Sequence, residues 1–199
     1  MKNAHAVTED LEAALVKYTG APYVCVVNSC TMALLLAVRW HRRGWVDIPK
    51  RTYISVPMSI IHAGSFPTFR DEDWVGAYQL KPLPIWDSAR CFTGNMYKQG
   101  QMQCVSFHLT KILGDTQGGA ILHDSKDADV WFRRARFDGR REGVAPKDDK
   151  FEIMGWHCYI SPDVSTRLLQ KLSVLPHHND SLPNDDYPDL SLINWRAML

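Results

Sequence analysis

Residues 28–31, Asn-Ser-Cys-Thr, lie where the apolar segment YVCVVN gives way to a nearly all-apolar helical pattern. Unpaired backbone amides and short hydroxyls at the start of a helix can bind an anion. The same residues could serve only to cap that helix, which is the commoner role of Ser and Thr there. The sequence has no glycine-rich loop or Walker pattern that would indicate a nucleoside triphosphate site.

Asp87 and Lys111 are two further candidates: Asp87 ends an expected strand, and Lys111 lies in the loop after another. A carboxylate at a strand end could orient a ligand, hold a cation or keep a heterocyclic nitrogen protonated, or it could only cap the next turn. Lys111, in the stretch SFHLTK, could be desolvated enough to act as an amine nucleophile or proton carrier. His108 beside it has no second His or carboxylate to complete a metal site.

Five arginines lie within nine residues, namely Arg133, Arg134, Arg136, Arg140 and Arg141. Such a cluster could hold substrate phosphate groups. A solvated helix face is the alternative for Arg133 and Arg134, which leaves Arg140 and Arg141, after Gly139, as the better candidates.

The elements that must position these residues alternate in the order typical of an α/β layer. Helical spacing predicts helices over 8–18, with Thr8 as cap, and over 32–43, 125–136 and 161–175, with a turn and helix within 52–64. Apolar β-rich segments predict strands within 23–28, 65–73, 80–88, 103–109 and 118–124. Because segment 23–28 is apolar on both faces, we expect a buried, parallel strand there. The predicted fold is a three-layer α/β domain, with helices on both faces of a mostly parallel sheet.

The composition indicates a globular domain of ordinary charge. The chain has 199 residues, 45% of them hydrophobic, and 23 Lys and Arg against 22 Asp and Glu, so it lacks the basic surplus of a general nucleic-acid binder. No window approaches the roughly 18 apolar residues of a membrane span. Five cysteines in no CxxC pair predict reduced thiols, and the start of the chain resembles no secretory signal, so we expect a cytoplasmic protein.

The motifs taken in order resemble the DegT/DnrJ/StrS family of pyridoxal-phosphate-dependent sugar aminotransferases. They are YTGAPYVCVVNSCTMALLLA, TYIS, WDSAR, SFHLTK followed by QGGAI, RFDG and MGWHCYIS, and they run from about Leu11 to Leu172. Several separated motifs in one order are more specific than any of them alone. The resemblance implies the large domain of a fold-type I enzyme of this cofactor class, pyridoxal 5'-phosphate as the cofactor, and no metal.

The resemblance also implies roles for individual residues. Lys111 would form a Schiff base with the cofactor and then carry protons, and Asp87 would pair with the protonated ring nitrogen. Ser29, Cys30, Thr31 and Ser106 would hold the cofactor phosphate, while Tyr53 would stack on one face of the ring and Ala89 lie on the other. A protonated ring withdraws electrons from the carbanion formed when an amine substrate loses its α-proton, which is why a carboxylate is needed behind it.

Four positions depart from the family pattern. Cys30 replaces a glycine, and Arg90 stands where His or Gln is common, near the cofactor phenolate. Asp138 replaces a His, and His157 takes the place of an Asn that reaches the cofactor phosphate of the neighbouring subunit. These departures affect the choice of substrate and the subunit contacts.

The expected activity is transfer of an amino group from an amino acid to a keto group of a nucleotide-linked sugar, in a homodimer with the active site at the interface. Family members continue into a smaller domain, so we expect a cofactor-binding large domain over 1–175 and a loop-rich tail over 176–199 without a complete small domain. Two alternatives remain: an enzyme with the same cofactor that modifies a nucleotide or DNA base, and a degenerate cofactor-binding protein without turnover.

Overall fold

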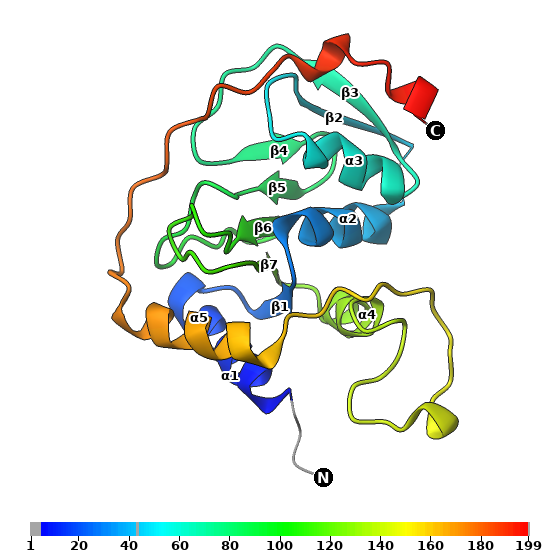
Figure 1. Cartoon of the computed structure of the whole chain (residues 1–199), viewed down its shortest axis with the longest axis vertical. Helices are drawn as coiled ribbons and strands as arrows, with labels where there is room; N and C mark the ends of the chain where they lie inside the picture. The colour runs from blue at the N-terminus through cyan, green and yellow to red at the C-terminus, as the bar shows by residue number, and fades with distance from the viewer. Residues whose placement is uncertain (1–4, 43, 199) are drawn as a thin grey trace.

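The computed structural model describes residues 5–42 and 44–198. The predicted α/β class is confirmed, since helices and strands alternate along most of the chain (Figure 1). The elements in chain order are α1 (Ala6–Thr19), β1 (Tyr23–Val27), α2 (Cys30–His41), β2 (Trp45–Pro49), α3 (Ser55–His62), β3 (Phe66–Arg70), β4 (Tyr78–Leu80), β5 (Ile85–Asp87), β6 (Met102–Ser106), β7 (Gly119–His123), α4 (Lys126–Ala135) and α5 (Pro162–Val174), with short 3-10 turns at Pro146–Asp148, Leu190–Leu192 and Trp195–Met198.

The strands form a mixed sheet, so the expectation of a mostly parallel sheet is wrong in detail. The order is β1-β7-β6-β5-β4, and only β5 and β6 pair parallel within it; β1, expected to be parallel, pairs antiparallel with β7. A separate parallel pair, β2 and β3, is joined to the residue that follows β4 by one antiparallel bridge between Asp47 and Lys81. Apolar residues on both faces of β1 indicate that the strand is buried, but they do not indicate the direction of the strand beside it.

The direction of β7 follows from the connection before it. The segment 107–118 between β6 and β7 contains no helix, so the chain turns back beside β6 instead of crossing over a face of the sheet. As a result β7 runs against both of its neighbours, while β1, β6 and β5 share one direction. The carboxyl ends of these three strands therefore meet at one edge.

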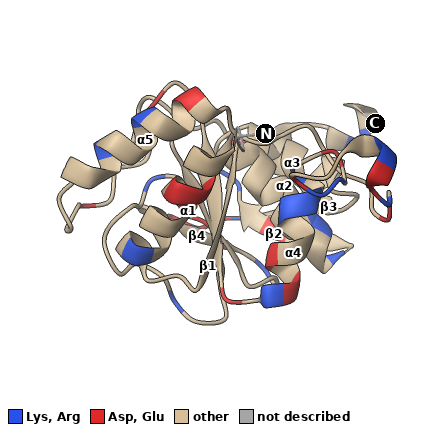
Figure 2. Ribbon diagram, turned by 90° about the horizontal axis from the view of Figure 1, so that it is seen from below, with Lys and Arg blue, Asp and Glu red and all other residues tan. Residues whose placement is uncertain are grey.

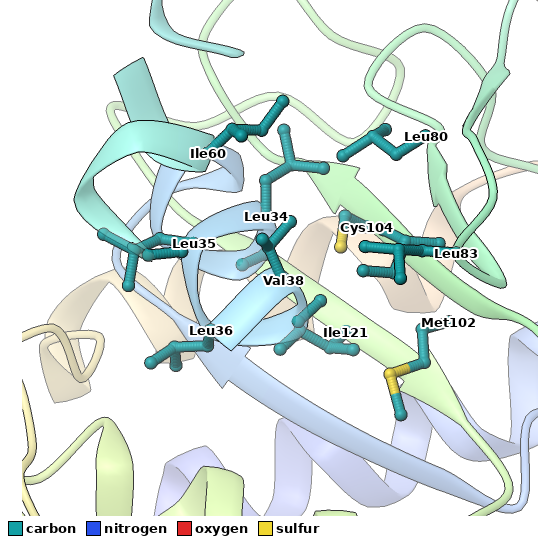
Figure 3. Close-up of a cluster of buried hydrophobic side chains, with 14 of the residues drawn as sticks. Leu34, Leu35, Leu36, Val38, Ile60, Leu80, Leu83, Met102, Cys104 and Ile121 are labelled. Atoms are coloured by element: carbon teal, nitrogen blue, oxygen red, sulfur yellow. The ribbon is translucent and has the colours of Figure 1, made fainter. Parts of the chain in front are cut away.

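Alternation along the strands produces two hydrophobic cores and hence three layers. On β1, Cys25 and Val27 face the core formed with α2, α3 and α4, while Val24 and Val26 face the core formed with α1 and α5. Figure 3 shows side chains of α2 gathered with Cys104 and Ile121 of the sheet. Because α2 contacts both the sheet and α3, it needs apolar residues nearly all round, and each buried leucine contributes about 1.5–3 kcal/mol.

Several boundaries differ from the sequence-based expectation. Helix α1 begins at Ala6, so Thr8 lies inside it, and its hydroxyl bonds that of Ser165 on α5 at 3.0 Å instead of capping the helix. Strands β2 and β4 were not predicted, and position 43, the expected end of the second helix, lies outside the described residues. None of the described helices has the length and hydropathy of a membrane-spanning segment.

The segment after α5 is irregular but it packs on the molecule. In Figure 1 it runs, orange to red, from α5 past the strands to β3. The amide of Leu190 donates to the carbonyl of Lys50 at 2.8 Å, and both Leu190 and Trp195 are buried. This segment therefore belongs to the folded unit and passes the sheet edge described next.

Candidate active site

A pocket of about 210 Å³ lies at the edge where β1, β5 and β6 end. It brings together nine of the ten predicted site residues, namely Ser29, Cys30, Thr31, Tyr53, Asp87, Ala89, Arg90, Ser106 and Lys111. These residues are spread over more than eighty positions of the chain. The fold, and not the local sequence, therefore brings them together.

The start of α2 forms one wall of the pocket. The hydroxyl of Ser29 accepts from the amide of Met32 at 3.2 Å, so Ser29 is the helix cap that its sequence position predicted. The Thr31 hydroxyl bonds that of Ser55 at 2.7 Å. The first amides of a helix have no acceptor within the helix, and the macrodipole adds partial positive charge, so this wall suits an anion.

Close packing of β7 against this helix start fixes the wall in place. A Cβ on Gly119 would lie 2.5 Å from the backbone nitrogen of Cys30 and 2.6 Å from the carbonyl carbon of Ser29. Such an approach is open only to glycine. The thiol of Cys30 points toward the backbone oxygen of Cys104, 3.6 Å away, so the Cys30 side chain is accommodated against β6.

Asp87, the last residue of β5, is a buried carboxylate at the base of the pocket. Its Oδ1 accepts from the amide of Ala89 at 3.0 Å, and its Oδ2 accepts from the hydroxyl of Tyr78 at 2.8 Å. Burial raises the pKa of Asp87, although both hydrogen bonds oppose the shift. Among the ion pairs of the described residues, none involves Asp87, so its charge has no direct cationic partner.

Lys111 lies on the loop between β6 and β7 and is half-buried in the pocket. Burial lowers the pKa of its amine, the charge of Arg90 lowers it further, and Asp87 partly opposes both effects. The loop is held by Asp115, whose carboxylate bonds Arg167 and Lys171 of α5, each at 2.9 Å. A lysine in this setting presents an uncharged amine more readily than a solvated lysine does.

Aromatic side chains form the outer wall, and sequence reasoning missed two of them. Tyr53 is expected from the TYIS motif and is 58% exposed, whereas Trp74 and Tyr187 were not predicted. The rings of Trp74 and Tyr187 are stacked, with centroids 6.3 Å apart and planes at 10°. Tyr187 belongs to the irregular C-terminal segment, where no periodic pattern marks a residue as part of a site.

Arg90 enters the pocket from the turn after β5 and is almost fully buried. Its Nη1 donates to the carboxylate of Asp185 at 2.6 Å and lies 3.4 Å from the hydroxyl of Tyr187. The sequence placed Arg90 near the site, but it gave no indication of a carboxylate partner from the tail.

His157 is the one predicted site residue that lies outside this pocket. It is exposed, and its ring nitrogen lies 2.9 Å from the carboxylate of Asp138. Since the predicted role of His157 concerns a neighbouring subunit, its surface position leaves that prediction untested.

Four of the five clustered arginines bind carboxylates of this chain. Arg133 and Arg136 both reach Glu12, Arg134 pairs with Glu152 and Arg141 with Asp149. Arg133 and Arg134 are therefore paired, partly buried side chains, and the interpretation of both as a solvated helix face is wrong. Figure 2 shows acidic and basic residues side by side on α4. The cluster is therefore largely neutralised within the fold.

Sequence comparison finds two partial matches to known proteins. The model of the DegT/DnrJ/EryC1/StrS aminotransferase family matches residues 3–85. The dTDP-4-amino-4,6-dideoxy-D-glucose transaminase of Shigella dysenteriae is 24% identical, over 60% of this chain and 44% of that protein.

Comparison of folds finds the same architecture in solved structures. AtS13 from Actinomadura melliaura has a TM-score of 0.76 at 19% identity, covering 86% of this chain and 60% of that one. Sugar aminotransferase CalS13 from Micromonospora echinospora has a TM-score of 0.71 at 18% identity, covering 84% and 61%. The chain thus spans less than two thirds of the length of each of these relatives. The chain thus resembles the DegT/DnrJ/EryC1/StrS aminotransferases in its motifs, in the match over residues 3–85 and in its fold, as the motifs predicted.

Proposed function

We propose that the pocket binds pyridoxal 5'-phosphate and that the chain provides the catalytic residues of an aminotransferase. The observation that carries this proposal is a buried carboxylate, Asp87, and an amine of lowered pKa, Lys111, in one pocket beside an anion-binding helix start. The cofactor has a group for each of these features: a ring nitrogen, an aldehyde and a phosphate.

The electrostatics of Asp87 support the fit. A buried carboxylate without a cationic partner is costly, and a protonated ring nitrogen placed against it would supply the missing positive charge. The start of α2, with the hydroxyls of Thr31 and Ser106, would hold the phosphate, and Tyr53 would cover one face of the ring.

When bound, the cofactor would supply the aldehyde and the electron-withdrawing ring. Lys111 would hold the cofactor at its aldehyde carbon through its uncharged amine, with the aldehyde oxygen leaving as water, and whenever it is not so bonded the same amine could accept and return a proton. Asp87 would hold the proton of the ring nitrogen in place throughout. Each residue thereby serves a role that its environment already favours.

The amino donor in this proposal is an amino acid, and the acceptor is a keto group of a nucleotide-linked sugar. The names of the relatives support this class of acceptor. The alternative of nucleic-acid modification gains no support from the arginine cluster, because most of its members are paired within the chain.

We further propose a homodimer in the cytosol, with residues 1–175 as the cofactor-binding unit and 176–199 as a tail. The exposed His157 would reach the cofactor phosphate of the partner subunit. Free thiols on all five cysteines support a reducing compartment.

The decisive experiment is borohydride reduction of the protein mixed with the cofactor, followed by peptide mass spectrometry. The expected product is one reduced adduct, located on Lys111. Lys111→Ala should lose the adduct, whereas Lys98→Ala, which removes an exposed lysine, should keep it. Adduct formation spread over several lysines, with none on Lys111, would contradict the proposal.

A further inference from the structure

Arg90 and Asp185 form an ion pair with one buried and one exposed partner. The side chain of Arg90 is 9% exposed and that of Asp185 is 61% exposed. Arg90 is fixed by the turn after β5, whereas Asp185 lies in a segment without helix or strand. Asp185 is therefore the partner that can leave without unfolding the pocket.

The ion pair with Asp185 leaves some hydrogen-bond donors of the Arg90 guanidinium without an acceptor among the described residues. The Nε of Arg90 is buried and has no hydrogen-bond partner among the described residues, while Nη1 binds Asp185. A guanidinium is best matched by an anion that takes two of its donors side by side. The Asp185 carboxylate, held at one nitrogen only, leaves that capacity unfilled.

The segment that carries Asp185 is docked by a few polar contacts. The amide of Leu182 donates to the carbonyl of Arg90 at 2.8 Å, and the side chain of Asn184 donates to the carbonyl of Trp74. The Tyr187 hydroxyl donates to Asp185 at 3.1 Å while its ring stacks on Trp74. Residues 182–187, here called the strap, thus contribute Tyr187 to the lining of the pocket and present a carboxylate to its arginine.

We propose that Arg90 is a carboxylate-binding residue of the pocket, and that Asp185 on the strap occupies it until the carboxylate of a small substrate takes its place. The contact with Asp185 itself demonstrates that a carboxylate fits there. This inference rests on the proposed function, which identifies the substrate as the amino-acid donor. The donor's carboxylate would bind Arg90, and its amine would then lie next to Lys111, the lysine that it must replace. Displacing Asp185 would also release Tyr187 and open the pocket to the second substrate.

The test uses glutarate, a five-carbon dicarboxylate without an amine, titrated calorimetrically into the complete chain. Asp185→Asn removes the competing carboxylate, so glutarate no longer has to break the ion pair between Arg90 and Asp185 before it binds. The affinity for glutarate should therefore rise roughly threefold to tenfold. Asp186→Asn, which removes the exposed neighbouring charge, is the matched control and should bind as the wild type does. Arg90→Gln should lose binding, and Arg90→Lys, which keeps the charge without the fork, should bind weakly.

Hydrogen exchange provides a second readout that a purely structural ion pair would not change. Glutarate should speed exchange of the Leu182 amide, because this amide is bonded to Arg90 only while the strap is docked. Equal affinity of Asp185→Asn and wild type, no glutarate binding by any variant, or stronger binding of inorganic phosphate than of glutarate would each overturn the inference. Reduction of the cofactor adduct at Lys111 is measured on the same samples, so its failure would contradict the proposed function alone.

Discussion

The hydroxyl of Tyr78 donates a hydrogen bond of 2.8 Å to Oδ2 of Asp87, and the two residues lie directly opposite each other on β4 and β5. The Tyr78 hydroxyl also bonds the hydroxyl of Thr52 at 2.6 Å. This buried chain orients the carboxylate without neutralising it. The fold thereby keeps a charged group at the base of the pocket at a cost in stability, as ligand sites commonly do.

Replacing Asp87 with Asn should leave the cofactor-free protein as stable as the wild type at neutral pH, or more stable by about 1 kcal/mol, because it removes an uncompensated buried charge. The amide can still accept from Ala89 and donate to Tyr78. Urea denaturation measures the free energy of unfolding, and the reduced adduct at Lys111 should be lost. A large loss of stability at pH 7 would show that the Asp87 charge is compensated in the folded state.

The raised pKa of Asp87 also predicts how the stabilities of the wild type and of Asp87→Asn differ with pH. Because the folded state binds this proton more tightly than the unfolded state does, the stabilisation is complete below the unfolded pKa and is lost as pH rises through the folded one. The unfolding free energy of the wild type minus that of Asp87→Asn should therefore fall from pH 4 to pH 8. A difference that rises over this range would contradict the assigned shift.

The amine of Lys111 should titrate below the ordinary lysine value of 10.5, since burial and the charge of Arg90 both disfavour its protonated form. Competitive acetylation over a pH series, read by peptide mass spectrometry, gives the midpoint. Arg90→Gln should move that midpoint upward by removing a positive charge. Arg196→Gln, outside the pocket lining, should leave it unchanged.

Gly119→Ala tests the contact between β7 and the start of α2. The added Cβ would meet backbone atoms of Ser29 and Cys30, which cannot move aside as a side chain could, so we expect a loss of about 1–3 kcal/mol in unfolding free energy. Adduct formation should weaken as well, because the anion-binding wall shifts. Gly44→Ala, where no atom lies within 4 Å of the new Cβ, should change stability by less than about 0.5 kcal/mol.

The sequence predicted best what is encoded locally. The cap at Ser29, the apolar α2 and the strand ending at Asp87 each follow from a few adjacent residues, and the motif order then related them to one pocket. The direction of β1 was predicted wrongly, because the apolar pattern of β1 is the same for either direction of β7.

Long-range polar partners were also not predicted. Asp185 meets Arg90 across 95 positions, and Arg136 meets Glu12 across 124, with no sequence pattern to link either pair. The arginine cluster looked like a phosphate-binding surface because its carboxylate partners lie elsewhere in the chain. Only the folded structure shows which charges are already paired.

Asp115 lies on the same loop as Lys111 and ties this loop to α5. Asp115→Asn should therefore affect both the stability of the protein and the position of Lys111. Hydrogen bonds from Arg167 and then Lys171 lower the pKa of this buried carboxylate. Losing such charge-assisted bonds should cost about 1.5–3 kcal/mol at pH 7. Asp163→Asn removes an exposed partner of the same Arg167 and should cost much less stability than Asp115→Asn.

The stabilisation from Asp115 has the opposite pH dependence to that of Asp87. Because its folded pKa lies below the unfolded value of about 3.9, the contribution is complete above that value and is lost as pH falls through the folded pKa. The difference in unfolding free energy between wild type and Asp115→Asn should accordingly be constant from pH 6 to 8 and shrink under acid conditions. Adduct formation at Lys111 should also slow in Asp115→Asn but not in Asp163→Asn, since only Asp115 belongs to the loop that carries the lysine and ties this loop to α5. An equal effect of the two substitutions on the adduct would show that α5 as a whole, and not this contact, positions Lys111.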